Sequence, residues 1–227
     1  MITIHEVEVL NSLEELVNPD SSAILVIDMQ NEIADQRGGY ARHRNDISGI
    51  QRIISTIARI LEAGRREGLL ISYAEFVHRN RGGLTLVDGP NLLLHSAQEW
   101  ISDVVEGSWE AQTVDELAPR AEDMVIQKSR ASAIYNTSLD NMLKSQGLKS
   151  LLLTGCQTDG CVLKTAVDMI QHGYYPVIVE DAVASLSEEN HALGLQYLKK
   201  KCPVFSSGQI LRTWVNPDQK EGGKNER

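Results

Sequence analysis

The sequence is poor in cysteine, in basic residues and in long apolar runs, and each shortage excludes a class of protein. Three cysteines in 227 residues are too few for a disulfide framework and suit a reducing compartment, so we expect a cytoplasmic protein. The 22 Lys and Arg stand against 31 Asp and Glu, which leaves a net charge of −9 and no broad basic surface for nucleic acid or an anionic membrane. No stretch reaches the roughly 18 apolar residues that span a bilayer, and the acidic start MITIHEVEVLNSLEEL is unlike a signal peptide. The expected partner is a small molecule or another protein.

The chain does have enough apolar material for a full core. Hydrophobic residues make up 42% of the sequence and charged residues 23%, and a chain of this length fits one large domain better than two small ones. We therefore expect a single domain over residues 1–227, which ends in a polar C-terminal tail at 216–227.

Short apolar runs rich in branched residues recur along the chain, and each is typical of a strand buried on both faces. They lie at 21–30, 68–77, 123–128, 150–155 and 175–181, with a sixth candidate at 202–207. Amphipathic stretches with helical spacing lie at 45–68, 137–147, 159–173 and 187–201. This alternation predicts a doubly wound, three-layer α/β/α fold around a mostly parallel sheet of about six strands. The less regular segment 78–122 is interpreted as an insertion over the crevice, with a helix near 92–105.

Three reactive side chains fall at the carboxyl ends of predicted strands. Asp28 follows the first strand, Lys128 ends the third, and Cys161 lies at the helix start after the fourth. Taken singly they read as a cap, a solvated lysine and an inert core cysteine, but parallel strands point their carboxyl ends into one crevice. Together they are a base, a cation and a nucleophile. We expect the helix start and the Lys128 ammonium to raise the thiolate fraction of Cys161, and Asp28 to accept the thiol proton.

The other two cysteines are interpreted as structural. Cys156 ends the fourth strand, where its side chain is expected to pack inward, and Cys202 begins the sixth. A zinc site is disfavoured because the spacing between Cys156 and Cys161 brings no second pair of ligands. A reversible disulfide between these two cysteines stays open as an alternative, although redox pairs favour the tighter CxxC spacing.

Three stretches resemble the isochorismatase-like cysteine hydrolases, and they follow the order of that family. They are LVIDMQN, VIQKSRASAIYNTSLDNML and LLLTGCQTDGCVLKTAVDMIQHGYYPVIVEDAVAS. The resemblance spans about 22–208. It implies that Asp28, Lys128 and Cys161 form a catalytic triad, in which the thiol attacks a carbonyl carbon to give a thioester that water then hydrolyses.

The same resemblance implies features of the backbone and of the assembly. It implies a cis peptide between Cys156 and Gln157, so that the backbone N–H groups of Gln157 and Cys161 form an oxyanion hole. It further implies a homo-oligomer, because members of the family pair to complete their pockets.

The sequence departs from the family where nicotinamidase-like members bind metal. Those members place a DxH motif after the second strand, whereas this chain has SYAEFVHRNRGG, in which His78 lacks such partners. We therefore expect neither a metal nor another cofactor, disfavour nicotinamide as the substrate, and interpret His78 as a residue of the surface or the crevice rim. Tyr135 follows Ile134, where the family often has an aromatic residue. Tyr135 and Trp109 are candidates for lining the pocket, with ordinary packing as the alternative.

We predict a cysteine-dependent amidohydrolase that cleaves the C–N bond of a small amide, ureide or carbamoyl compound and releases ammonia or an amine. Two alternatives stay open. One is an isochorismatase-type vinyl-ether hydrolase, in which Asp28 protonates the substrate and no thioester forms; the presence of Cys161 disfavours it. The other is a non-catalytic binding subunit that retains the fold, which the intact triad disfavours.

Overall fold

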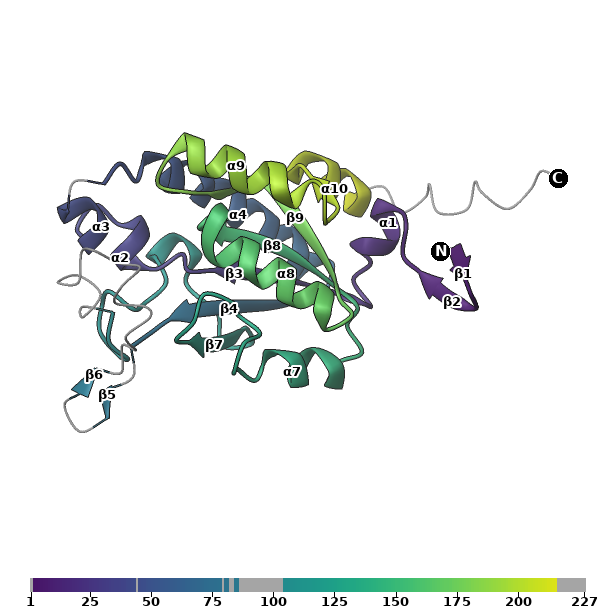
Figure 1. Cartoon of the computed structure of the whole chain (residues 1–227), viewed down its shortest axis with the longest axis horizontal. Helices are drawn as coiled ribbons and strands as arrows, with labels where there is room; N and C mark the ends of the chain where they lie inside the picture. Colours follow the sequence, from purple (N-terminus) through teal and green to yellow (C-terminus); the bar gives the residue numbers. More distant parts are fainter. Residues whose placement is uncertain (1, 44, 79, 82–83, 86–103, 216–227) are drawn as a thin grey trace.

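The computed structural model describes residues 2–43, 45–78, 80–81, 84–85 and 104–215 of the chain. Its centre is a six-stranded sheet in which every neighbouring pair of strands runs parallel (Figure 1). In spatial order the strands are β10 (Val204–Phe205), β9 (Tyr175–Ala184), β8 (Ser150–Cys156), β3 (Ser22–Ile27), β4 (Leu70–Phe76) and β7 (Met124–Lys128). The predicted strands and the doubly wound α/β class are confirmed, although the sixth strand is shorter than its apolar run.

The winding of the chain decides where a site can form. From the central β3 the chain adds β4 and then β7 on one side, and then crosses back to add β8, β9 and β10 on the other. The strand order therefore reverses between β3 and β8. In open parallel sheets a crevice forms at such a reversal, outside the carboxyl ends of the strands. Here those ends are Ile27 and Cys156.

Among the described residues, five helices of seven residues or more accompany the sheet. They are α4 (Ser48–Arg66), α7 (Leu139–Ser145), α8 (Leu163–Gln171), α9 (Glu188–Leu198) and α10 (Ser207–Val215). Shorter helical turns are α1 (Leu13–Leu16), α2 (Asn31–Ala34), α3 (Gly39–Arg42), η1 (Asp115–Leu117) and η2 (Thr158–Val162). The four predicted amphipathic helices are confirmed, whereas α10 was not predicted. The predicted helix near 92–105 falls almost wholly, and the tail at 216–227 wholly, outside the described residues.

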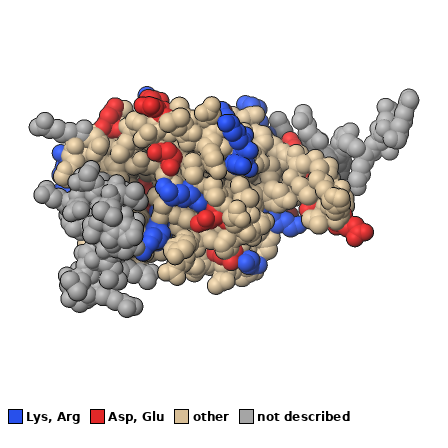
Figure 2. All heavy atoms as spheres, in the orientation of Figure 1, with Lys and Arg blue, Asp and Glu red and all other residues tan. Residues whose placement is uncertain are grey.

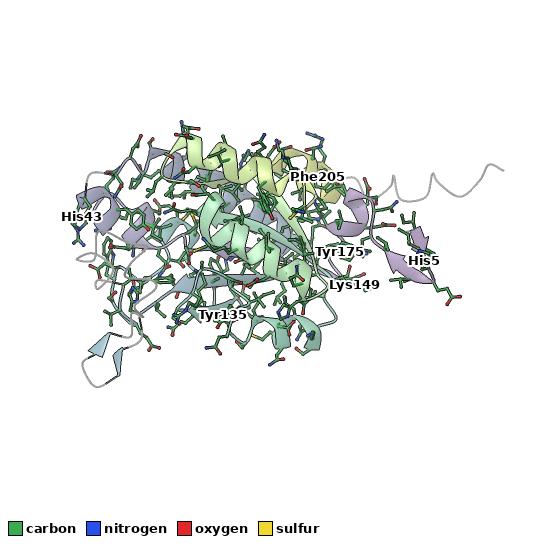
Figure 3. The ribbon with its side chains drawn as sticks, in the orientation of Figure 1. His5, His43, Tyr135, Lys149, Tyr175 and Phe205 are labelled. Carbon is green, nitrogen blue, oxygen red and sulfur yellow. The ribbon has the colours of Figure 1, made fainter. Side chains whose placement is uncertain are left out.

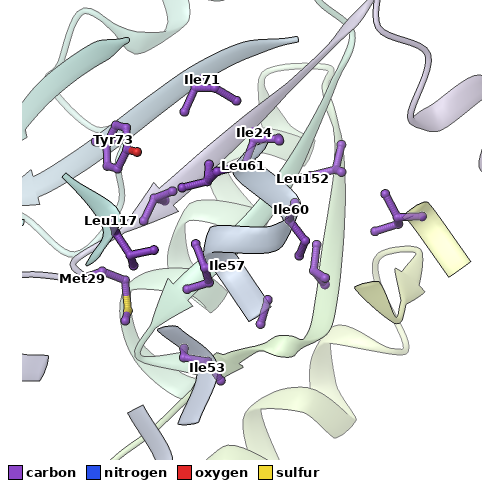
Figure 4. Close-up of a cluster of buried hydrophobic side chains, with 14 of the residues drawn as sticks. Ile24, Met29, Ile53, Ile57, Ile60, Leu61, Ile71, Tyr73, Leu117 and Leu152 are labelled. Carbon is purple, nitrogen blue, oxygen red and sulfur yellow. The ribbon is translucent and has the colours of Figure 1, made fainter. Parts of the chain in front are cut away.

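Alternate residues of β3 divide the core into two layers, because successive side chains of a strand point to opposite faces of the sheet. Ile24 and Val26 pack with α4 and α10 on one face, and Leu25 and Ile27 pack with α7 and α8 on the other. Figure 4 shows the first layer, in which isoleucines of α4 at helical spacing meet the strands. All six residues of β3 are buried, so the strand that leads to Asp28 is held firmly on both faces.

Two small hairpins extend from opposite ends of the molecule (Figure 1). One pairs β1 (Ile2–Ile4) with β2 (Val7–Val9), and the other pairs β5 (Asn80–Arg81) with β6 (Leu84–Thr85); both are antiparallel. Within the described ranges, no helix combines the length and the apolar character that crossing a bilayer requires.

Candidate active site

The structure brings Asp28, Lys128 and Cys161 together beside the reversal point of the sheet. The Lys128 Nζ atom lies 2.9 Å from Asp28 Oδ2 and 3.4 Å from Cys161 Sγ, so one ammonium contacts both other groups. Asp28 and Lys128 are each 2% exposed, whereas Cys161 is only partly buried. A carboxylate, an ammonium and a thiol therefore share one small volume just beneath the surface.

Asp28 is held in place by its backbone. It has a φ of +52°, in the left-handed region that aspartate enters more readily than most residues, and its N–H donates to the carbonyl of Ala74 at 2.9 Å. Its Oδ2 accepts a hydrogen bond from Lys128, while the buried Oδ1 has no hydrogen-bond partner among the described residues. Because each carboxylate oxygen can accept hydrogen bonds, Oδ1 is available to a thiol or to a bound molecule.

Lys128 is a buried cation with several acceptors around it. Its Nζ also donates to the carbonyl of Arg130 at 3.2 Å and lies 5.0 Å from the centre of the Phe76 ring. Burial by itself lowers the pKa of this ammonium, but the negative charges of Asp28 and of an ionised Cys161 outweigh it and raise the pKa above its ordinary value. Lys128 therefore stays protonated at neutral pH and cannot serve as the base.

The thiol of Cys161 is less acidic than the sequence suggested. Burial and then the Asp28 carboxylate raise its pKa to about 12, and the Lys128 ammonium, which acts in the opposite direction, does not compensate. The expected rise in the thiolate fraction is therefore wrong, because burial and the Asp28 carboxylate together outweigh the effect of the Lys128 ammonium on the pKa of the thiol. At neutral pH the site holds a neutral thiol beside a carboxylate, so nucleophilic attack by the sulfur requires a base.

The peptide bond between Cys156 and Gln157 is cis, as the resemblance implied. Cys156 is fully buried, and its Sγ lies 3.2 Å from the carbonyl oxygen of Asp28, within reach of an S–H donor. Cys202 is also buried, and all three cysteines are free thiols. Burial raises the pKa of the Cys202 thiol to about 11 and that of Cys156 well above its ordinary value. Both side chains pack within the core clusters, in agreement with the inward packing expected of them.

The turn that carries Cys161 is braced by α9 and by the residue that follows β9. Thr158 Oγ1 lies 2.9 Å from His191 Nδ1, and Ser185 Oγ donates to Asp159 Oδ1 at 2.6 Å. Gly194 lets α9 come this close, because a Cβ atom on it would lie 2.8 Å from the backbone nitrogen of Asp159. The position of the turn therefore depends on a helix that comes later in the chain.

Gly155 permits the close approach of β8 to β3 just before the site. Its φ is +103°, and a Cβ atom there would lie 2.1 Å from the carbonyl oxygen of Ile27. Ile27 directly precedes Asp28, and Gly155 directly precedes Cys156. A side chain at this position would therefore push apart the two strand ends that flank the site.

We expect Gly155→Ala to lower the free energy of unfolding by roughly 2–5 kcal/mol, because overlap with backbone cannot be relieved by a side-chain rotation. Gly147→Ala is the matched control. Its φ is also positive, at +67°, but nothing lies within 4 Å of its Cβ position, so only the left-handed conformation costs stability, by about 1–2 kcal/mol. Urea denaturation of both variants measures the difference; equal losses would contradict this account.

Gln30 was not predicted as part of the site, yet it joins the strand ends. Its Nε2 donates to the carbonyls of Phe76 and Ala111, both at 2.8 Å, and its Oε1 accepts the N–H of Phe76 at 2.8 Å. This buried amide fastens the residues after β3 to the end of β4 and to the segment that precedes η1. The available signal was its position in LVIDMQN, two residues after Asp28.

Tyr40 of α3 is a second buried residue at the site that the sequence did not indicate. Its hydroxyl lies 3.5 Å from Gln157 Nε2. Burial, and then the nearby thiols of Cys156 and Cys161, raise the pKa of this phenol far above neutrality, so it remains protonated. No sequence signal could have found it, because a four-residue helix is too short to show a periodic pattern.

The placement predicted for His78 is wrong. The residue is 3% exposed, and its ring meets the Phe76 ring edge-on with 5.0 Å between centroids. The backbone N–H of His78 donates to the carbonyl of Val104 at 2.8 Å. The prediction fails because Val104 and Ala111 pack with Val77, the residue before His78, and Val105 pairs with His78 itself. In the part of the chain that the structure describes, no group of three or more His, Cys, Asp or Glu side chains is placed to hold a metal.

The two aromatic candidates differ in exposure. Tyr135 is 60% exposed on the segment between β7 and α7, where Figure 3 labels it. Trp109 is partly buried, and the guanidinium carbon of Arg37 lies 4.6 Å from the centre of its ring. A role for either ring in contacting substrate stays a prediction.

The chain was compared with protein-family models, with curated sequences and with solved structures. The model of the isochorismatase domain matches residues 22–209. The ureidoacrylate amidohydrolase RutB of Enterobacter sp. (strain 638) is 32% identical over 185 residues, which cover 75% of this chain and 78% of that protein. An isochorismatase-like hydrolase from Alkaliphilus metalliredigens has a TM-score of 0.69 and 29% identity, over 86% of this chain and 99% of that one. N-carbamoylsarcosine amidase from Thermoplasma acidophilum has a TM-score of 0.66 and 26% identity, over 82% of this chain and 96% of that one.

Proposed function

The chain belongs to the isochorismatase family, and we propose that it is a cysteine-dependent amidohydrolase that cleaves the C–N bond of a small ureide, carbamoyl compound or other amide. The names of two similar proteins, a ureidoacrylate amidohydrolase and an N-carbamoylsarcosine amidase, support this substrate class. The observation that carries the proposal is the Lys128 ammonium, which contacts both the Asp28 carboxylate and the Cys161 thiol. This arrangement supplies a nucleophile with a base and a fixed counter-charge.

The first half of the reaction forms the thioester. Cys161 Sγ attacks the carbonyl carbon while its proton passes to Asp28, and the carbonyl electrons move onto oxygen. The backbone N–H groups of Gln157 and Cys161 are the proposed donors to this oxyanion; one such donor is typically worth about 3 kcal/mol. The intermediate then collapses with cleavage of the C–N bond, and the nitrogen takes the proton from Asp28 and leaves as ammonia or an amine.

The second half releases the acyl group. A water molecule gives its proton to Asp28 and attacks the thioester carbon, and collapse of the second intermediate breaks the C–S bond. The sulfur recovers its proton from Asp28, which returns the site to a neutral thiol and a carboxylate. Throughout the cycle Lys128 keeps its charge, because its pKa is raised, and it compensates whichever of its two neighbours is negative.

The proposed mechanism has consequences for cofactors and for the redox state of the cysteine. It requires no cofactor, because each proton is held at a named side chain and the oxyanion is met by backbone donors. It requires a reduced Cys161, and we therefore place the protein in the reducing cytoplasm.

A substrate panel tests the proposal. N-carbamoyl amino acids, ureido acids and simple primary amides are incubated with the protein, and ammonia is measured; isochorismate is assayed in parallel for pyruvate. We expect ammonia from at least one ureide or carbamoyl compound and no pyruvate. Pyruvate without ammonia would replace the proposal with the vinyl-ether hydrolase, and inactivity on the whole panel would favour the binding subunit.

Gly194→Ala is expected to lower kcat on the best panel substrate about 10-fold, because small displacements of a reacting group carry large kinetic costs. In an ordinary helix interior this change stabilises by about 1 kcal/mol, but here the methyl group overlaps the backbone of Asp159. Gly49→Ala in α4 is the control, since its Cβ meets nothing nearer than 3.5 Å, and it should keep the parental kcat. A parental kcat in Gly194→Ala would show that α9 does not position the turn.

A further inference from the structure

The N-terminal hairpin has one face made wholly of branched apolar side chains. Its two strands pair so that Ile2 lies opposite Val9 and Ile4 lies opposite Val7, and the side chains of such pairs project to the same face. Ile2, Ile4 and Val7 are 44%, 48% and 62% exposed, and Val9 is partly exposed. The chain's own fold therefore leaves most of this face open.

The hairpin is weakly stabilised by itself. Its turn residues His5 and Glu6 both have positive φ, at +46° and +65°, which is unfavourable for residues other than glycine. A lone two-stranded hairpin is also marginal in water. Figure 1 shows it projecting beyond α1, and Figure 3 labels His5 on it. A projecting apolar face of this kind is typical of an interaction site.

The sequence narrows the choice of what covers this face. The C-terminal tail NPDQKEGGKNER, at 216–227, has no apolar side chain except that of Pro217 and cannot supply an apolar cover. An anionic membrane is disfavoured by Glu6 and Glu8 on the hairpin and by the net charge of −9. In Figure 2 the hairpin end of the molecule shows uncharged surface with acidic side chains beside it. The complementary surface should be apolar with basic neighbours.

The outer face of α9 has these properties. Leu193 and Tyr197 lie one helical turn apart and are 57% and 43% exposed. The helix runs directly into Lys199, Lys200 and Lys201, the only run of three lysines in the sequence. Two exposed apolar side chains followed by a basic segment match, in chemistry and in charge, an apolar hairpin face that has Glu6 at its turn.

We propose that the hairpin of one molecule docks on α9 of a second copy of this chain, with its apolar face over Leu193 and Tyr197. A two-fold axis lets each copy give one hairpin and receive one. The inner side of α9 contacts the turn of Cys161 through His191 and Gly194. The docked hairpin therefore stabilises a helix on which the site of its partner depends.

The test compares the mass and the self-association of full-length variants by sedimentation velocity over a range of concentrations. Ile4→Ser/Val7→Ser removes the apolar face of the hairpin, and Leu193→Ser/Tyr197→Ser removes the face of α9. We expect a dimeric parent, and a dissociation constant raised about 100-fold or more in either variant, because apolar anchors dominate such interfaces. Val125→Ser, at an exposed apolar position on β7, is the control and should associate like the parent.

Two further measurements make the proposal specific. Mixing the two double variants should restore dimers, because one intact hairpin then meets one intact α9. His5→Asn supplies a residue that a two-residue hairpin turn favours and keeps Glu6, so it should tighten association. All these positions are exposed, so circular dichroism should show parental folding.

Several results would overturn the proposal. A parent that stays monomeric at every concentration would do so, as would either double variant that associates like the parent. Loss of association in the hairpin variant alone would mean that the hairpin meets some surface other than α9. Binding of the parent to phosphatidylserine vesicles in place of self-association would assign the face to a membrane.

Discussion

The rate of ammonia release is expected to fall roughly 10⁴- to 10⁶-fold in Cys161→Ala, the range typical of losing a catalytic nucleophile. The substitution removes the sulfur that lies 3.4 Å from Lys128 Nζ and leaves the ion pair between Lys128 and Asp28 intact. Folding should be nearly unaffected, because Cys161 is only partly buried. Initial rates with the best substrate of the panel measure the effect.

Two matched variants separate chemistry from packing. Cys202→Ala removes a buried thiol that packs in the core, and it should keep the parental rate within a few-fold. Cys161→Ser keeps the size of the side chain but replaces the thiol by a much weaker nucleophile, so it should be nearly as impaired as Cys161→Ala. Ammonia from Cys161→Ala at the parental rate would remove the thioester from the mechanism and leave the fold assignment untouched.

The sheet was largely predictable because its strands are buried on both faces. Such strands read as continuous apolar runs, as in SSAILVIDMQ, and the isoleucines of α4 recur at helical spacing over about three turns of helix. The helix α10 was missed because it is short and directly follows the sixth apolar run, so that its two buried anchors, Ile210 and Trp214, do not form a recognisable period. The N-terminal hairpin alternates apolar and polar residues, but its eight residues carry no glycine turn to announce it.

Convergence at the site was predictable for a different reason. The carboxyl ends of parallel strands lie along one edge of the sheet, so side chains that follow different strands can reach one crevice whatever their distance in sequence. The protonation state of Cys161 was not predictable in this way. It depends on the balance between burial, one carboxylate and one ammonium, and that balance depends on distances that a sequence does not contain. Tyr40 and Gln30 escaped notice because each is placed by tertiary contacts.

Asp28→Asn is expected to have opposite effects on two reactions of the same sulfur. Turnover should fall about 10²- to 10⁴-fold, because the proposed base for the thiol proton is gone. Alkylation of Cys161 by iodoacetamide at neutral pH should become faster. After burial, the Asp28 carboxylate is the largest cause that raises the pKa of this thiol to about 12. Without it the Lys128 ammonium acts unopposed by a carboxylate, the pKa falls, and the thiolate fraction at neutral pH rises.

The direction of the change in alkylation distinguishes a neutral Cys161 thiol from a thiolate that is already paired with Lys128. If Cys161 and Lys128 already formed a thiolate–ammonium pair in the parent, removal of the carboxylate would leave alkylation nearly unchanged, and the raised pKa would be contradicted. The double variant Asp28→Asn/Lys128→Met is the control. It also removes the ammonium, so burial alone acts on the thiol, the pKa rises again, and the gain in alkylation should disappear. Alkylation of Cys161 is followed by peptide mass analysis, with the buried Cys202 as the internal reference. Faster alkylation together with slower turnover is the result that a neutral thiol activated by Asp28 requires.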